Sequence, residues 1–345
     1  MYIILLGDKN MKYLVICDYR EKFTNYSVTC NDTYNDHPDR KNINEIVAAI
    51  KSLGYDCDYF GGIPELIHAI DQKTHFKNTA FLNFTDGLDQ NYSRVQAPAL
   101  LDILKVNYSG SDIFPSVIMN NKHFCKQVLS DNDIELPKSC LVNSLLPLNI
   151  REIRSWKFPL FVKPNCEGSS LGISSDSVCH TAEDVEWKVD NLREKFDEIL
   201  IEEFVPGIDI TNYLVGNPGE YYINDVITAE LYNKSSYAVY DANAKHNKLR
   251  TLFLNEERIP SDMLHKIQSQ SEKIAKIIGA RDICRIDYRL DAQTGKFTFI
   301  EINSAPRFSS TSEIGFVAQK RGLTFADMLH YYLNAFNDRI GISQS

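Results

Sequence analysis

The sequence predicts an α/β protein whose C-terminal part is α+β. In the first hundred residues, short apolar runs alternate with helically spaced segments, and beyond residue 208 strands dominate until one long helix. Strands that alternate with helices indicate a parallel sheet covered by helices. A chain of 345 residues exceeds the usual size of one domain. We place three domains at residues 11–114, 115–201 and 202–340.

The elements of the N-terminal domain follow from apolar spacing. Ile43, Ile46 and Ile50 recur with helical periodicity, and Pro64 marks the first turn of another helix. The expected strands are 13–17, 56–60 and 80–84, the expected helices are 43–53, 64–70 and 97–104, and residues 106–110 lead out of the last of these helices.

In the rest of the chain, one helix is expected over residues 116–130 and carries Lys122. Strands are expected at 159–164 and 198–205, and the second is ended by Pro206 and Gly207. A helix at 262–278 is closed by Gly279. The last expected element is an amphipathic helix at 325–336.

Composition excludes several classes of function. The net charge of −9 argues against a nucleic-acid-binding protein, which usually shows a basic stripe. The eight cysteines form no CxxC pair, which indicates reduced thiols rather than a zinc ribbon. No apolar run reaches membrane-spanning length, and residues 2–6 are too short for a signal peptide. We expect a cytoplasmic protein without nucleic-acid or membrane partners, in which residues 1–10 are an extension.

The most informative pattern is a polar pair on each of two neighbouring apolar strands. Arg285 and Asp287 lie two residues apart, and so do Glu301 and Asn303 after a Gly-containing turn. Because side chains alternate across a strand, each pair shares one face. The turn is short enough for a hairpin. If Asp287 lies opposite Glu301, then Arg285 lies opposite Asn303.

The two faces of this hairpin differ in character. The polar face gathers two carboxylates and an amide oxygen beside a guanidinium. Such ligands suit Mg²⁺, which proteins usually hold with few carboxylates and nucleotide phosphates. The pattern therefore predicts a magnesium–ATP site, and the alternative is a surface hairpin of mixed charges. The other face is expected to enter the core through Cys284, Ile286, Tyr288, Leu290, Ile300 and Ile302.

Two further segments could bind a nucleotide. Lys163 stands on an apolar strand before the Gly/Ser loop 167–172, whose N–H groups and hydroxyls could cover phosphates. The alternative is a flexible turn, since neither the Walker nor the dinucleotide spacing is present. Glu202 and Asp209 flank a strand end where adenine and ribose could bind. The alternative there is a strand end with solvated acids.

Taken together, these segments resemble the ATP-grasp superfamily, and within it the D-alanine–D-alanine ligase branch. Residues 159–172 match the family's phosphate-covering loop, 201–207 its adenine-binding strand end, and 107–112 the segment that enters the central domain. The two polar pairs match its metal and transition-state residues. The resemblance implies an ATP-grasp fold preceded by a Rossmann-like parallel-sheet domain.

The resemblance also assigns roles by position. It implies ATP as co-substrate, two Mg²⁺ (or Mn²⁺), small amino-acid or peptide substrates, and a homodimer. Catalytic roles fall on Arg285, Lys245 and Ser169. Nucleotide-binding roles fall on Lys122, Lys163, Glu167, Ser169, Ser170, Glu202, Glu203, Phe204, Val205, Asp209 and Lys245. Substrate roles fall on Arg285, Arg307 and Ser312, and metal-binding roles on Asp287, Glu301 and Asn303.

The chain departs from the family's pattern in the half that binds amino acids. The first strand ends in Cys-Asp-Tyr-Arg-Glu at 17–21, where the family has a Gly-Gly-x-Ser-x-Glu turn. His246 replaces a tyrosine, Arg307 a glycine, and Cys166 an arginine. Arg307 could clamp a substrate carboxylate through two hydrogen bonds, or it could point to solvent.

These observations predict an ATP-dependent carboxylate–amine ligase. A carboxylate attacks the γ-phosphate, and an amine then displaces phosphate from the acyl phosphate to give an amide. We expect amino-acid substrates other than two D-alanines, with residues 233–252 as a lid over the reaction. The alternatives are a true D-alanine–D-alanine ligase, an inactive nucleotide-binding regulatory protein, and another ATP-grasp reaction such as carboxylation.

Overall fold

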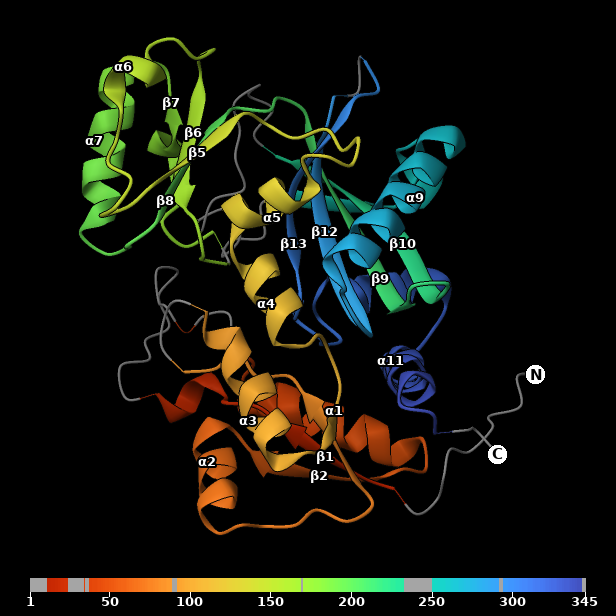
Figure 1. Ribbon diagram of the computed structural model, residues 1–345. Helices are drawn as coiled ribbons and strands as arrows, with labels where there is room; N and C mark the ends of the chain where they lie inside the picture. The colour runs from red at the N-terminus through yellow and green to blue at the C-terminus, as the bar shows by residue number, and fades with distance from the viewer. Residues whose placement is uncertain are drawn as a thin grey trace.

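The computed structural model describes residues 11–23, 34, 37–88, 92–168, 170–232, 250–291 and 294–342. These residues form three sheets with flanking helices (Figure 1). One sheet belongs to the N-terminal part of the chain, a second to the middle, and a third to the C-terminal part. In the described part of the chain, no helix combines the length and apolarity needed to span a bilayer.

The N-terminal sheet has the order β2-β1-β3-β4, and every neighbouring pair is parallel. Alternate residues of β1 face opposite ways: Tyr13 and Val15 pack towards α1, while Leu14 and Ile16 pack towards α2 and α3. The sheet is therefore covered on both faces, which confirms the predicted Rossmann-like arrangement. Its elements are β1 Lys12–Ile16, α1 Arg40–Ser52, β2 Asp56–Gly61, α2 Ile63–Asp71, β3 Thr79–Asn83, α3 Gln96–Leu104 and β4 Asn107–Tyr108.

The helix predicted over residues 116–130 is in fact two helices, α4 Ile113–Asn120 and α5 Lys122–Leu129. Asn121 between them is extended, with φ −101° and ψ 100°, and its side chain accepts a hydrogen bond from the backbone N–H of Phe124. This is the contact of an N-cap residue, so the chain starts a new helix there. As a result, Lys122 is the first residue of α5 rather than a mid-helix residue.

The central sheet is antiparallel, with the order β5-β8-β6-β7. Helix α7 packs on it through Val185 and Val189, which contact Val162 and Ile201 in one apolar cluster. The predicted domain boundary between residues 201 and 202 falls inside β8. The elements are β5 Ser139–Val142, α6 Ile150–Ile153, β6 Leu160–Pro164, β7 Val178–Cys179, α7 Ala182–Arg193 and β8 Ile199–Glu203.

The C-terminal sheet is also antiparallel, with the order β11-β10-β9-β12-β13. Helix α9 covers one face of it in the cluster that contains Ile267 and Ile274. Helix α10 was not among the predicted elements. The elements are β9 Ile208–Asn217, β10 Glu220–Leu231, β11 Arg250–Leu254, α9 Ser261–Ile278, β12 Ile283–Leu290, β13 Phe297–Asn303, α10 Glu313–Arg321 and α11 Phe325–Arg339.

The hairpin of β12 and β13 has the predicted register: Asp287 pairs with Glu301, and Arg285 with Asn303. A bulge after Asp287 then pairs Tyr288 with Phe299, which leaves Ile300 unpaired. The prediction that Ile300 enters the core is therefore wrong. Phe299 is fully buried in its place, and Ile300 lines the cleft described below.

The C-terminal helix returns to the N-terminal domain. Residues of α11 such as Tyr332 and Phe336 share one buried cluster with Tyr13 of β1, and the hydroxyl of Tyr13 donates to Asn337 at 2.8 Å. In Figure 1, α11 lies between the N-terminal and C-terminal sheets. This packing fixes the two domains against each other and sets the cleft between them.

Candidate active site

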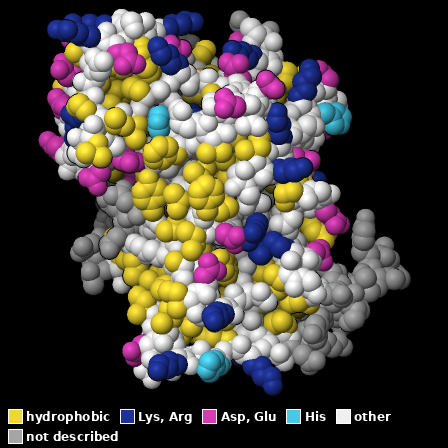
Figure 2. Space-filling view, in the orientation of Figure 1, with side chains coloured by type: hydrophobic (Ala, Val, Ile, Leu, Met, Phe, Trp, Pro, Cys, Tyr) yellow, Lys and Arg dark blue, Asp and Glu magenta, His cyan; other side chains and the backbone are white. Residues whose placement is uncertain are grey.

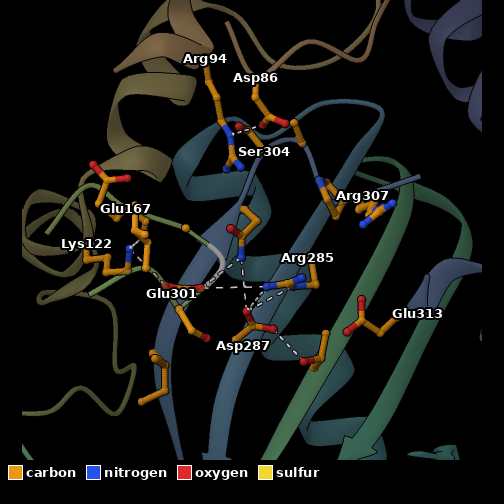
Figure 3. A pocket seen from close by; sticks show the side chains of 18 of the residues that line it. Asp86, Arg94, Lys122, Glu167, Arg285, Asp287, Glu301, Ser304, Arg307 and Glu313 are labelled. Carbon is orange, nitrogen blue, oxygen red and sulfur yellow. Dashed lines mark hydrogen bonds and ion pairs between the residues drawn. The ribbon is translucent and has the colours of Figure 1, made fainter. Parts of the chain in front are cut away.

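A cleft of about 530 Å³ is lined by residues from all three sheets and their connections. Asp86 and Arg94 reach into it from the N-terminal part of the chain, and Arg285 and Glu301 from the C-terminal hairpin (Figure 3). Lys163 of the central sheet also lines it. This volume is within the range of roughly 300–1,000 Å³ that small-molecule sites occupy. The cleft is therefore large enough for a nucleotide or a small substrate, and its walls are strongly charged.

The hairpin places its polar residues on the wall of this cleft. Nη2 of Arg285 lies 2.8 Å from Oδ2 of Asp287 and 4.0 Å from Oε1 of Glu301. The hydroxyl of Thr211, on the neighbouring strand β9, donates to Oδ1 of Asp287 at 2.7 Å. Tyr213 lies two residues further on, opposite Arg285. The structure thus brings the predicted guanidinium and both predicted carboxylates together.

The two carboxylates differ in their proton affinity. Burial raises the pKa of Asp287, the charge of Glu301 adds to the rise, and Arg285 opposes it. Burial also disfavours ionisation of Glu301, but Lys122, Lys163 and Arg285 outweigh it and lower the pKa of Glu301 to about 2. Glu301 is therefore ionised at neutral pH, and a further cation beside Asp287 would favour its ionised form as well.

The residues present suit a hard divalent cation. Among the described residues, no group of three or more His, Cys, Asp and Glu side chains could hold a metal ion. Two carboxylates are nevertheless what Mg²⁺ needs when nucleotide phosphates supply the remaining oxygens. Asn303 currently donates its amide N–H to Asp287 and Glu301, at 3.3 and 3.4 Å. Its predicted role as a metal ligand requires the amide to turn so that the oxygen faces the carboxylates.

Three lysines surround the predicted phosphate-binding region. Nζ of Lys122 lies 3.3 Å from Oε2 of Glu301 and donates to the carbonyl of Glu167 at 2.5 Å. Lys163 and Lys126 both pair with Glu202, at 2.5 and 2.8 Å. Because Lys163 and Lys122 also line the cleft, this wall carries positive charge that suits phosphate groups.

The Gly/Ser loop after Lys163 forms part of the same wall. Glu167 and Ser170 line the cleft. Ser170 has φ 60° and Gly172 has φ 74°. A Cβ atom at Gly172 would lie 2.7 Å from Cγ of Pro164, so a side chain there would collide with that ring. Ser169 falls outside the described residues, as does the predicted phosphate ligand Lys245.

The end of β8 forms the predicted adenine site. Glu203, Phe204 and Val205 all line the cleft. Glu202 is 2% exposed, and its carboxylate is already held by two lysines. Burial alone would raise the pKa of Glu202, but these lysines lower it to about 2. An adenine amino group would therefore have to share an already paired carboxylate.

The predicted ribose ligand Asp209 is also paired. Its Oδ1 lies 2.7 Å from Nη1 of Arg289, whose Nε donates to the carbonyl of Val205 at 3.2 Å. Arg289 was not predicted. It lies on β12 two residues beyond Asp287, on the same face, so the strand alternation that found Asp287 could have found it.

The two predicted substrate residues after Pro306 lie in different places. Arg307 is exposed and lines the cleft. Ser312 is absent from the lining residues, and its hydroxyl lies 2.9 Å from the backbone carbonyls of Arg307 and Ser309. The structure therefore does not bring Ser312 to the site, because its hydroxyl closes the turn before α10.

Two charged residues that line the cleft near Arg285 were not predicted from the sequence. Glu313, the first residue of α10, forms an ion pair with Arg250 of β11 and accepts a hydrogen bond from Tyr213 at 3.1 Å. Figure 3 shows Glu313 and Arg307 on the same side of the cleft, beyond Arg285 as seen from Glu301. No local pattern links Arg250 and Glu313, since they are 63 residues apart.

The end of β1 does not present a free carboxylate to the cleft. Asp18 is buried, and it accepts the N–H at the start of α2 at 3.0 Å and the hydroxyl of Thr85 at 2.8 Å. Arg20 lines the cleft and pairs with Asp39 at 3.0 Å. Glu21 is exposed and accepts from the backbone at the start of α1.

Comparison with known proteins identifies the family. Residues 144–334, more than half of the chain, match the family model of the D-ala D-ala ligase C-terminus. The chain belongs to the D-alanine–D-alanine ligase family. It is 31% identical to the D-alanine–D-alanine ligase of Aquifex aeolicus over 67% of this chain and 74% of that protein. It is 27% identical to that of Bartonella bacilliformis over 67% and 72%.

Solved structures support the fold. The D-alanine–D-alanine ligase of Bacillus anthracis complexed with ATP superposes with a TM-score of 0.71 at 18% identity, covering 94% of this chain and 97% of that one. VanG D-Ala:D-Ser ligase of Enterococcus faecalis superposes with a TM-score of 0.71 at 18% identity, covering 95% and 100%. The predicted ATP-grasp fold is therefore confirmed.

Family membership also confirms the predicted class of enzyme. The protein is an ATP-dependent ligase that forms amide bonds, and ligases of this family use ATP and Mg²⁺. Its substrates are small molecules of the amino-acid type. The carboxylates Asp287 and Glu301 are both intact. The predicted alternative, a catalytically inactive regulatory protein, is therefore not needed to explain them.

Proposed function

We propose that this ligase joins two amino-acid or peptide substrates of which at least one is not D-alanine, through an acyl phosphate. The observation that supports this proposal is the positive charge of Arg307, at the end of the cleft where we place the acceptor substrate. The relatives named above include enzymes for D-Ala–D-Ala and for D-Ala–D-Ser. An ATP-grasp ligase fold is therefore compatible with more than one acceptor.

Arg307 differs from the other arginines of the cleft. Of the six arginines that line it, five form ion pairs with a carboxylate. Among the described residues, Arg307 alone of the six has no ion-pair partner. An unneutralised guanidinium at the mouth of a site is suited to bind a carboxylate in a two-pronged geometry. The paired arginines are Arg20, Arg94, Arg250, Arg285 and Arg289.

We therefore assign the acceptor carboxylate to Arg307 rather than to Ser312, whose hydroxyl is committed to the loop. Glu313 and Arg250 close this end of the cleft as a neutral pair. In place of the family's Gly-Gly-x-Ser-x-Glu turn, this chain has residues 17–21. The acidic side chains among them are buried or lie outside the cleft, and Asp18 is an example. The donor amino acid is for these reasons expected to differ as well.

The residues of the cleft suit the two chemical steps. Lys122 and Lys163 orient and neutralise the phosphates, and Arg285 stabilises the charge that develops on the transferring phosphoryl group. Asp287, Glu301 and Asn303 would hold Mg²⁺, which supplies charge neutralisation of the phosphate oxygens. The donor carboxylate oxygen attacks phosphorus and ADP leaves. The acceptor amine then attacks the acyl carbon, the C–O bond breaks, and phosphate departs with that oxygen.

A substrate matrix tests this proposal. Purified protein, ATP and Mg²⁺ are incubated with pairs of amino acids and dipeptides of both stereochemistries, and ADP, phosphate and product mass are measured. We expect ADP release with at least one pair that includes a substrate other than D-alanine. Arg307→Ala should raise the acceptor KM about tenfold or more without changing the KM for ATP. Activity with two D-alanines alone would contradict the proposal.

We also propose that the protein is a homodimer. Ile103, Phe114, Phe124 and Val128 of α3, α4 and α5 are 61, 71, 48 and 40% exposed. Figure 2 shows hydrophobic side chains gathered across the middle of the face that carries these helices. Exposed apolar patches of this kind commonly mark association surfaces.

A cytoplasmic location remains a proposal, supported by seven described cysteines that are free thiols.

A further inference from the structure

Lys126 is a buried charge that the chemistry above does not use. It lies one turn after Lys122 on α5 and is 2% exposed. It does not line the cleft. An isolated ammonium at such a position would be very costly, so it must be paired and hydrogen-bonded.

The partners of Lys126 come from both walls of the nucleotide cleft. Its Nζ lies 2.8 Å from Oε2 of Glu202 on β8 of the central sheet. The same Nζ donates to the carbonyl of Ile300 on β13 of the C-terminal sheet at 2.9 Å, and it lies 6.0 Å from the centre of the Phe299 ring. One ammonium thus contacts both the central and the C-terminal sheet.

One partner, Glu202, is itself a predicted nucleotide-binding residue, and the other, Ile300, is next to the predicted metal ligand Glu301. Glu202 also pairs with Lys163 at 2.5 Å, so Lys126 fixes the carboxylate that orients a phosphate-binding lysine. Ile300 is the residue left unpaired by the β-bulge, and Glu301 follows it. The bond from Lys126 to this carbonyl holds the backbone that places Glu301 in the cleft.

The charges of this cluster are unbalanced in the protein alone. Lys126 and Lys163 bring two positive charges and share the single carboxylate of Glu202. Lys163 is also the member of the cluster that lines the cleft. A phosphate group beside Lys163 would supply the missing negative charge. Such a phosphate would therefore add to the stability of the arrangement of Lys126, Glu202 and Lys163.

We propose that Lys126 is a positioning residue for the nucleotide: it sets the affinity for Mg·ADP and Mg·ATP by holding Glu202 and the Ile300–Glu301 backbone, without touching the ligand. This inference rests on the proposed nucleotide site. It predicts that this buried side chain affects the affinity for the nucleotide but does not affect the KM for the acceptor amino acid. A purely structural lysine would change the thermal stability alone.

The test compares Lys126→Met with Arg321→Met in the full chain. Arg321 pairs with buried Asp225 at 2.6 Å, and neither residue lines the cleft. Mg·ADP binding is measured by calorimetry, and thermal unfolding is followed by circular dichroism. We expect Lys126→Met to weaken Mg·ADP binding about tenfold or more, with the acceptor KM unchanged. Arg321→Met should lower the unfolding temperature but leave Mg·ADP affinity within twofold of wild type.

Two further variants of Lys126 complete the design. Lys126→Arg should recover at least part of the lost affinity, because it keeps the charge and the donors. Lys126→Gln replaces the methionine variant if the latter does not fold, and the same tenfold loss is expected. An affinity within twofold of wild type in the folded uncharged variant would overturn the inference. Failure of the wild-type protein to bind Mg·ADP would instead contradict the nucleotide site itself.

Discussion

Replacing Arg285 with alanine should abolish turnover while leaving nucleotide binding almost intact. Arg285 lies 2.8 Å from Asp287 and 4.0 Å from Glu301, and we propose that it stabilises the charge that develops during phosphoryl transfer. One arginine in that role is typically worth about 10³–10⁵ in rate, or about 4–7 kcal/mol. We therefore expect kcat to fall at least a thousandfold and the Kd for Mg·ADP to change by less than about fivefold.

The same variant should change the pH dependence of any residual activity. Burial raises the pKa of Asp287, and Arg285 opposes that rise. Without Arg285 the pKa of Asp287 rises further, so the carboxylate becomes protonated at a higher pH. Because the ionised form is the one that binds a cation, the acid limb of log kcat/KM should move to higher pH.

Arg289→Ala provides a matched control on the same strand and face. Arg289 holds Asp209 at 2.7 Å and the carbonyl of Val205 at 3.2 Å, at the predicted ribose and adenine end. Its loss should raise the KM for ATP while kcat stays within about threefold. Coupled ADP-release kinetics and calorimetry with Mg·ADP separate the two patterns. Wild-type kcat in Arg285→Ala would refute the role of Arg285 in phosphoryl transfer.

Two further properties can be predicted from the same structure. Glu202 ionises with a pKa of about 2 in the folded chain against 4.5 ordinarily, so it contributes roughly 3 kcal/mol above pH 4.5 that is lost as the pH falls towards 2. Urea unfolding at pH 7, 4.5 and 2.5 should show this loss of unfolding free energy, and the loss should be smaller in Glu202→Gln than in the wild type. Equal losses in the two proteins would contradict the prediction. Phe114→Asp should convert the proposed dimer to a monomer in light scattering, whereas Ile67→Asp on α2 should not, and an unchanged dimer would place the interface elsewhere.

The sequence was sufficient to predict the hairpin of β12 and β13 because strand alternation has a fixed period of two. Once Asp287 was placed opposite Glu301, the shared face followed, and the register agrees. The bulge at Ile300 was not predictable, since no glycine or proline marks it. A bulge depends on what packs beneath it, and here Phe299 fills the core in place of Ile300.

Long-range charge pairs explain most of what sequence reasoning missed. Lys122 was predicted to lie on a helix, but Lys126 was not singled out, and their partners Glu301 and Glu202 come from strands far along the chain. Local chemistry also changed one expectation. Ser312 matches the family by position, yet its hydroxyl bonds to the turn before α10. Motif position alone does not show whether a side chain is free to bind a substrate.

Transfer of oxygen from the donor carboxylate to phosphate tests the proposed chemistry most directly. The donor amino acid found in the substrate matrix is labelled with ¹⁸O in its carboxylate, and the released phosphate is analysed by mass spectrometry. An acyl phosphate leaves one carboxylate oxygen on phosphate, so each phosphate should carry one ¹⁸O when product forms. Unlabelled phosphate, or label found in AMP, would contradict activation of the carboxylate by the γ-phosphate.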